Sequence, residues 1–314
     1  MLDWQSAEEN GSESLTQHVS RDRLHVVSSK VPVWTRLIRI WTYRALLLSL
    51  VRKELSVKYK NSVLGFAWSM LNPALTLVVY YVVFQLVLKN GMPQFAIFLL
   101  CGLVIWNFFS TALSGATSSV VANAGIVQKV SFPREVLPLA SVGSALVFLF
   151  LQLIVLAIAL VIGRDVPAFS YLALLIPAFV DLVILAAAFS VFLSAVNVYY
   201  RDTQHLLEIV LMAWFWGTPV VYAYQTIAVP LARHHLGWLF FLNPVTAIVI
   251  TFQRVLYAKV SPVLATGSVM KILPTGSPLW FLGQLAIVFV VSCVLFVIAL
   301  SVFGRMEGNF AEEL

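Results

Sequence analysis

Charge and cysteine are both scarce in this sequence. Only 11% of its 314 residues are charged, against about 25% in soluble globular proteins. The two cysteines, Cys101 and Cys293, lie inside long apolar runs, where a thiol packs as a small buried hydrophobe. The composition therefore excludes an ordinary soluble domain and predicts no disulfide framework.

Motifs of several enzyme and transporter classes are missing as well. The chain has no GxxxxGK[ST] phosphate loop and no Gly-Lys pair, so it cannot bind ATP in that way. It has no DxD pair, which a membrane glycosyltransferase acting on lipid-linked sugars should show. It has no internal repeat. A proton-coupled transporter needs a chain of ionisable groups at membrane depth, and Asp181 and Glu208 are too few to form one. We expect no catalytic residue, no metal site and no cofactor in this chain.

Apolar residues, by contrast, are abundant. They make up 61% of the sequence, and the mean hydropathy is +0.92. Runs of at least about 18 apolar residues can cross a bilayer as helices, and such runs fall at 64–88, 95–121, 138–162, 170–198, 205–224 and 278–303. The sequence therefore predicts an all-α integral membrane protein with six transmembrane helices in residues 64–303.

The distribution of Lys and Arg sets the expected topology. If the N-terminus is cytosolic, 14 of the 20 basic residues lie in the N-terminal region, the 122–137 and 199–204 turns and the C-terminal tail 304–314. This bias satisfies the positive-inside rule, so we expect both termini in the cytosol. The net charge of +6 then indicates a membrane surface and not a nucleic-acid partner.

Two different segments precede the first apolar run. Residues 1–30 are polar and mixed in charge, so we expect a disordered cytosolic tail and no cleavable signal peptide. In residues 31–63, Trp34, Leu37, Ile38 and Trp41 recur at three- and four-residue steps, which predicts an amphipathic helix lying in the membrane interface. A bend is expected near residues 49–51, before the basic part of this segment.

The basic run after that bend has two open interpretations. Arg52, Lys53, Lys58 and Lys60 could hold anionic lipid head groups or a diphosphate, or they could simply anchor the chain on the positive side of the membrane.

The stretch 199–224 combines a charged turn with an aromatic span. Arg201 and Asp202 lie at its start, and Gly217 and Pro219 interrupt its apolar part. Because Pro219 has no amide hydrogen, the carbonyl of Phe215 loses its helical partner, and the span is expected to kink there.

Six stretches, in order, are similar to one protein family. They are RKELSVKYKNSVLGFAWSMLNP (52–73), GIVQKVSFPREVLPLA (125–140), AVNVYYRDTQHL (195–206), GTPVVY (217–222), the Asn243-Pro244 pair and FAEEL (310–314). Together they resemble the permease subunits of type-2 ABC exporters that secrete polysaccharides, the O-antigen and teichoic-acid exporter family.

The resemblance implies a homodimer in the bacterial cytoplasmic membrane. Two copies would dock two copies of a separate ABC ATPase, which carries ATP and Mg, to export a polyprenyl-diphosphate-linked glycan such as O-antigen, teichoic acid or cell-wall galactan. The 125–137 turn would be the coupling helix, although a turn that only sets topology is the alternative. The implied site residues are Val130, Phe132, Pro133, Arg134 and Glu135 for ATPase coupling, and Arg52, Lys53, Lys58, Lys60, Arg201 and Asp202 for the cytosolic gate where the lipid diphosphate enters.

Residues 225–277 are too long for a simple hairpin and are interrupted by prolines. The resemblance implies two short re-entrant helices here, before the last span. A loop domain resting on the membrane is the alternative.

Aromatic residues form stripes in the second and fifth spans. They are Phe95, Phe98, Trp106, Phe109, Trp214, Phe215 and Tyr222. Flat apolar rings can contact any sugar without binding it tightly at one position, which suits a glycan that slides past them. Aromatic belts at the membrane interfaces and ordinary helix packing would also explain these residues. We expect an aromatic conduit, and a drug- or lipid-exporting permease of the same architecture is the alternative function.

Overall fold

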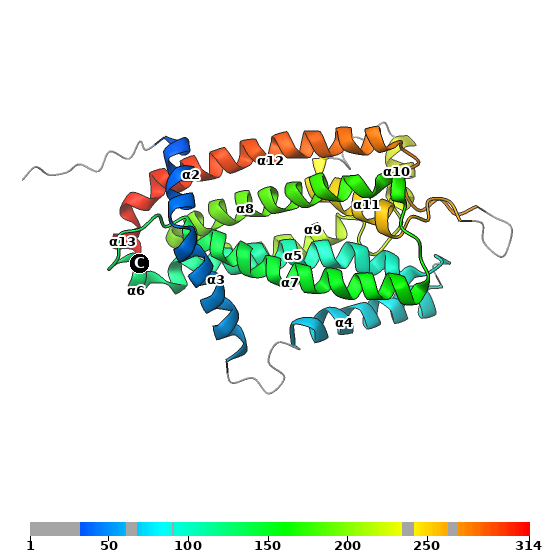
Figure 1. Ribbon diagram of the computed structural model, residues 1–314, viewed down its shortest axis with the longest axis horizontal. Coiled ribbons are helices and arrows are strands. Elements are labelled where there is room, and N and C mark those ends of the chain that lie inside the picture. Colours follow the sequence, from blue (N-terminus) through cyan, green and yellow to red (C-terminus); the bar gives the residue numbers. More distant parts are fainter. Residues whose placement is uncertain (1–31, 61–67, 90, 234–241, 263–268) are drawn as a thin grey trace, which may run out of the picture. The chain divides into compact units, whose positions relative to one another are not determined.

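A computed structural model describes residues 32–60, 68–89, 91–233, 242–262 and 269–314 (Figure 1). The predicted tail at 1–30 lies outside these residues. The described helices are α2 (Val33–Thr42), α3 (Arg44–Tyr59), α4 (Trp68–Tyr81), α5 (Phe95–Ala122), α6 (Ala124–Val127), α7 (Val136–Gly163), α8 (Leu175–Tyr199), α9 (Thr203–Trp216), α10 (Tyr224–Arg233), α11 (Pro244–Leu256), α12 (Pro278–Met306) and α13 (Phe310–Glu313). A π-helical turn (Val82–Val87) extends α4, a 3-10 turn (Phe169–Leu174) precedes α8, and another (Glu307–Asn309) joins α12 to α13.

Four of these helices are long and apolar enough to cross a membrane. They cover Phe95–Ala122, Val136–Gly163, Phe169–Tyr199 and Pro278–Asn309. These spans agree with the second, third, fourth and sixth apolar runs of the sequence. Because each is about 28 to 32 residues long, each exceeds the roughly 20 residues that a helix needs to cross a bilayer.

The centre of the described bundle is α5. It packs against α7 and α8, and α8 packs in turn against α12. Of the four long helices, α5 is the most buried and α12 the least. A predominantly apolar helix such as α12 with so much uncovered surface is suited to a lipid environment.

Neither of the remaining two predicted spans is among these four helices, and the first four residues of the predicted span 64–88 lie outside the described residues. α4 with its π-helical turn covers Trp68–Val87, and Pro73 lies inside it. α9 has 14 residues, so at about 1.5 Å per residue it is about 21 Å long, less than the roughly 30 Å of a hydrocarbon core.

The prediction of a kink at Pro219 is wrong, because the helix has already ended before this residue. α9 stops at Trp216, and the chain passes through a non-helical segment before α10 begins at Tyr224. The carbonyl of Phe215 is not left without a partner either, since it accepts a hydrogen bond from the amide of Thr218 at 3.1 Å.

In the described part of the chain, two short helices lie between α9 and α12. The 10 residues of α10 and the 13 of α11 are too few to cross a bilayer. α11 is buried along almost its whole length and packs against α5, α8 and α12. Such cover is what a short apolar helix needs at membrane depth.

The predicted bend in the N-terminal helix occurs earlier than expected. α2 ends at Thr42 and α3 begins at Arg44, with Tyr43 between them, whereas the predicted bend was at 49–51. Trp34 and Trp41 of α2 are 73% and 70% exposed, as tryptophans of an interfacial helix are expected to be. Arg52 therefore lies within α3, on its exposed side.

Candidate cytosolic cavity and coupling surface

A cavity of about 450 Å³ opens between α3, α5 and α7. It mixes charged, hydroxyl and apolar side chains. Its lining consists of Leu50, Lys53, Glu54, Val57, Lys58, Gly115, Ser118, Ser119, Ala122, Asn123, Leu137, Ala140 and Ser141. A cavity with ammonium groups beside apolar walls is suited to an anionic, partly apolar ligand.

Side-chain contacts hold the charged groups of this cavity in place. Lys53 donates to the amide oxygen of Asn123 at 2.9 Å. Glu54 accepts from the hydroxyls of Ser141 and Ser144, each at 2.8 Å. These contacts tie α3 to the end of α5 and to α7, against which it packs.

Lys58 is the unusual cation of the cavity. Its ammonium lies 4.6 Å from the ring centroid of Phe148 on α7. Burial lowers the pKa of Lys58, against the opposing charge of Glu54. An anion in the cavity would therefore recover part of the charge stabilisation that burial removes.

The structure brings together only part of the predicted cytosolic gate. Lys53 and Lys58 line the cavity, whereas Arg52 on α3 and Lys60 directly after α3 are exposed outside its lining. Arg201 and Asp202 are exposed in the turn between α8 and α9. The six residues are therefore placed on separate surfaces.

The predicted coupling residues point in two directions. Val130 is 56% exposed, and Ile126 and Lys129 beside it are also exposed. Phe132 packs partly against a hydrophobic cluster that includes Phe310. The outward surface of the 125–137 turn thus carries an apolar valine and isoleucine beside a lysine, as a protein contact surface does.

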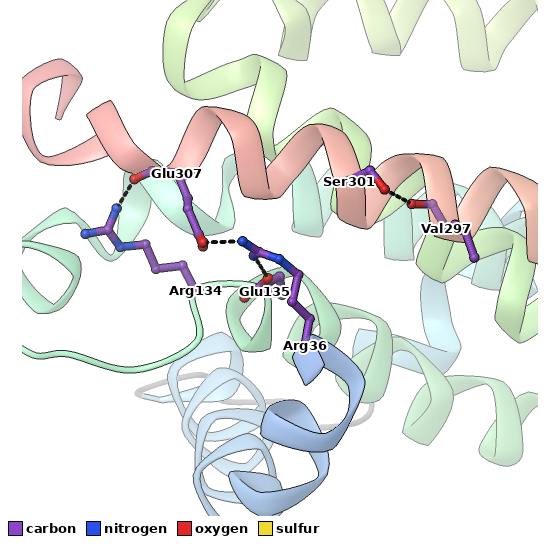
Figure 2. A network of polar contacts seen from close by, with 6 residues as sticks. All are labelled: Arg36, Arg134, Glu135, Val297, Ser301 and Glu307. Atoms are coloured by element: carbon purple, nitrogen blue, oxygen red, sulfur yellow. Dashed lines mark hydrogen bonds and ion pairs between the residues drawn. The ribbon is translucent and has the colours of Figure 1, made fainter. Parts of the chain in front are cut away.

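Pro133, Arg134 and Glu135 do not belong to that outward surface. Pro133 and Arg134 are half-buried, and Glu135 is buried. Figure 2 shows Arg134 and Glu135 directed toward Glu307 and Arg36, which come from opposite ends of the chain. Sequence reasoning missed Arg36 and Glu307, because nothing in their spacing marks them as partners.

The predicted conduit residues form one packed aromatic cluster within the chain. Trp106 and Trp214 contact Phe215 and Phe109 respectively, with ring centroids 5.5 and 5.1 Å apart. Phe95, Phe98 and Phe109 have no exposed surface in this conformation, whereas Trp214 and Tyr222 are half-buried. In this arrangement only the rim of the cluster can contact a ligand.

A polar junction lies where α9 ends. The side chain of Asn243 accepts a hydrogen bond from the indole of Trp214 at 2.8 Å and donates to the hydroxyl of Thr218 at 2.9 Å. It also caps α11 by accepting from the amide of Val245. Gln253 of α11 donates to the carbonyl of Pro219 at 3.0 Å. The Asn-Pro pair marks a helix start in the sequence, but its contact with α9 is not readable there.

Asp181 is enclosed within the chain. It is 1% exposed on α8, and one of its carboxylate oxygens has no hydrogen-bond partner in the part of the chain that the structure describes. Asp181 is therefore covered by other residues of its own chain in this conformation.

Comparison with known proteins identifies the family. The family of ABC-2 type transporters matches residues 45–257. An O-antigen export system permease protein RfbA of Myxococcus xanthus is 33% identical over 281 residues, which cover 89% of this chain and 99% of that protein. A protein of the same name from Klebsiella pneumoniae is 28% identical over 86% of this chain and 95% of its own length. The polysialic acid transport protein KpsM of Escherichia coli is 20% identical over 57% of this chain and 70% of its own length. This chain belongs to the ABC-2 type transporter family.

Proposed function

We propose that this chain is the membrane subunit of an ATP-driven exporter of a polyprenyl-diphosphate-linked polysaccharide. The observation that carries the proposal is the 33% identity to the M. xanthus permease, which extends over 99% of that protein. Two copies of the chain would form the channel in a bacterial cytoplasmic membrane, with both termini in the cytosol. ATP hydrolysis would take place on two copies of a separate ABC ATPase, and this chain would not itself be an enzyme.

The cytosolic cavity supports a role in loading. Lys53 and Lys58 present two cations at the cavity, and ammonium groups suit phosphate oxygens. The apolar walls supplied by α3 and α5 suit the first isoprene units of a lipid carrier. Arg52 and Lys60, which are exposed outside the cavity lining, then attract the anionic lipid.

The outward surface at 126–130 supports a role in coupling. An ATPase can press on Val130 and Ile126 directly, because both are exposed on the same short turn. The turn leads straight into α7 (Val136–Gly163), so movement of the turn shifts the cytosolic end of a long helix.

The conduit would open where α9 and α11 meet α5. Gly102 of α5 permits this packing, because a β-carbon there would lie 3.1 Å from Val220 and 3.2 Å from the Gln253 amide nitrogen. α10 and α11 are proposed to be the two re-entrant helices. Separation of α9 from α5 would expose the rings of Trp106 and Phe109 to the glycan.

The test is ATP-dependent transport into inverted membrane vesicles. The chain and its cognate ABC ATPase are co-expressed, and uptake of a radiolabelled polyprenyl-diphosphate glycan is compared with uptake by vesicles whose ATPase lacks its phosphate-loop lysine. Uptake that requires the intact ATPase supports the proposal. Uptake of a fluorescent phospholipid or dye, with none of the glycan, would favour the drug- or lipid-exporting alternative.

The glycan is then identified in cells. The pair is expressed in strains that each lack one exporter, for O-antigen, teichoic acid or galactan. The surface polymer whose export is restored identifies the substrate.

A further inference from the structure

Arg36 is the one buried residue of helix α2. It is 5% exposed, whereas Trp34 and Trp41 of the same helix α2 lie mostly uncovered. A guanidinium cannot be deprotonated at physiological pH, so burial requires partners for its charge. The position of Arg36 is therefore maintained by specific contacts.

Two carboxylates from distant parts of the sequence share this guanidinium (Figure 2). One nitrogen of Arg36 pairs with Glu135, the residue directly before α7. Another pairs with Glu307, directly after α12, at 2.7 Å. One planar fork with five donors can satisfy both carboxylates, which a lysine ammonium does less well.

The same junction contains a second arginine, Arg134, and a glycine, Gly304, that lies against Arg36. Arg134 donates to the backbone carbonyl of Glu307, and its guanidinium carbon lies 5.8 Å from the ring centroid of Phe310. Gly304 of α12 faces Arg36 so closely that a β-carbon there would lie 2.8 Å from its Nε. The absence of a side chain at Gly304 therefore makes room for the guanidinium.

We propose that Arg36, Glu135 and Glu307 form a clasp that fastens the coupling turn to both the interfacial helix α2 and the end of α12. A push on Val130 then moves three elements together instead of α7 alone. This inference rests on the proposed function, in which an ATPase contacts the 126–130 surface. Arg36 is a positioning residue, because it acts through the turn and touches neither nucleotide nor glycan.

The clasp differs in its consequences from a merely stabilising ion pair. A stabilising pair predicts that its loss lowers the amount of folded protein and leaves each folded transporter working normally. A clasp predicts that folded transporters lacking it still hydrolyse ATP but export less glycan for each ATP. The ratio of glycan exported to ATP hydrolysed therefore separates the two roles.

Gly304→Ala is the sharpest variant, because it displaces Arg36 without removing any charge. Gly308→Ala is the matched control, since no atom lies within 4 Å of the added β-carbon. Arg36→Gln and Arg36→Lys complete the series, and the conservative lysine should rescue part of what glutamine loses. Each variant is purified with its ATPase and reconstituted in vesicles.

The clasp predicts that Gly304→Ala and Arg36→Gln lower the glycan exported per ATP about tenfold, with Gly308→Ala unchanged and Arg36→Lys intermediate. A parental ratio in folded Gly304→Ala and Arg36→Gln complexes would overturn it.

A second measurement judges the clasp independently of transport. Amide hydrogen exchange of the purified permease should rise together in 131–136 and 305–310 in the Gly304→Ala and Arg36→Lys variants, both of which keep a cation at position 36. Exchange that rises in neither segment, or in one alone, overturns the clasp. If the parental pair exports no glycan while the exchange rises in both segments, the proposed function fails and the clasp stands.

Discussion

Replacing Arg36 should destabilise the end of the protein where α2 meets the start of α7 and the end of α12 far more than replacing Glu135. Removing one partner of a buried ion pair costs about 3 to 5 kcal/mol, because the other charge stays buried without compensation. Arg36→Gln leaves two carboxylates, those of Glu135 and Glu307, facing a position without a cation. We expect the upper part of that range for this variant.

Glu135→Gln removes a negative charge whose burial is already unfavourable. Burial raises the pKa of Glu135 from its ordinary value of 4.5, and the neighbouring charge of Glu307 raises it further, against the opposing effect of Arg36. After the substitution Arg36 still pairs with Glu307, and the amide oxygen can still accept a hydrogen bond. The cost should be about 1 kcal/mol or less, the size of one ordinary hydrogen bond.

The stabilities of Glu135→Gln and Arg36→Gln, each relative to the parental protein, should change with pH in opposite directions. A carboxylate whose folded-state pKa is raised contributes stability below its unfolded pKa of about 4.5, and that contribution is lost as the pH rises through the folded value. The stability of Glu135→Gln should therefore increase relative to that of the parental protein as the pH rises above about 4.5. Arg36→Gln should recover as the pH falls, because a protonated carboxyl can donate a hydrogen bond to its neighbour.

Chemical and thermal unfolding of purified protein in one detergent, followed by tryptophan fluorescence at several pH values, measures these differences. Gly308→Ala serves as the control for handling. If Glu135→Gln destabilised the protein as much as Arg36→Gln at pH 7, the shared-guanidinium reasoning would be refuted.

Four further predictions concern the remaining surfaces. Val130→Asp should lower recovery of the ATPase on tagged permease about tenfold without changing the amount of permease, and unchanged recovery would remove 126–130 as the coupling surface. Lys58→Met should raise the KM for the lipid diphosphate more than it lowers kcat in vesicles, and an effect on kcat alone would contradict a loading role. Asn243→Ala removes hydrogen bonds worth about 1 kcal/mol each, so it should lower the Tm, and a parental Tm would show that the junction is not stabilising. In a cysteine-free background, a cysteine at Gly308 should resist an impermeant thiol reagent in intact cells while one at Val269 is labelled; labelling at Gly308 without lysis would contradict the topology.

The long spans could be predicted from sequence because each is a single apolar run bounded by polar residues. Phe95–Ala122 and Val136–Gly163 agree with the predicted 95–121 and 138–162 within about two residues. Hydropathy alone determines such helices, since every backbone group must be paired inside the membrane. The ends of α9 and α2 were missed because they depend on local breakers and tertiary contacts instead of on hydropathy.

The 125–137 turn, the predicted coupling helix, illustrates why site residues are harder to predict than spans. Val130 and Glu135 are five residues apart, and the sequence assigns both to one contact surface. In the structure Val130 faces outward and Glu135 is buried against Arg36. The difference is set by residues about 100 and 170 positions away in the chain, which no local pattern records.

The polar junction at the end of α9 explains how the chain tolerates a broken helix among apolar segments. Ending α9 at Trp216 frees carbonyls that a lipid environment could not satisfy. Gly217, Thr218 and Pro219 instead meet Asn243 and Gln253 from α11. Because the hydrogen bonds of the break are supplied by a second short helix, moving α11 would unpair the end of α9 as well. The two elements must therefore move together, so opening the proposed conduit would require α9 and α11 to leave α5 as one unit.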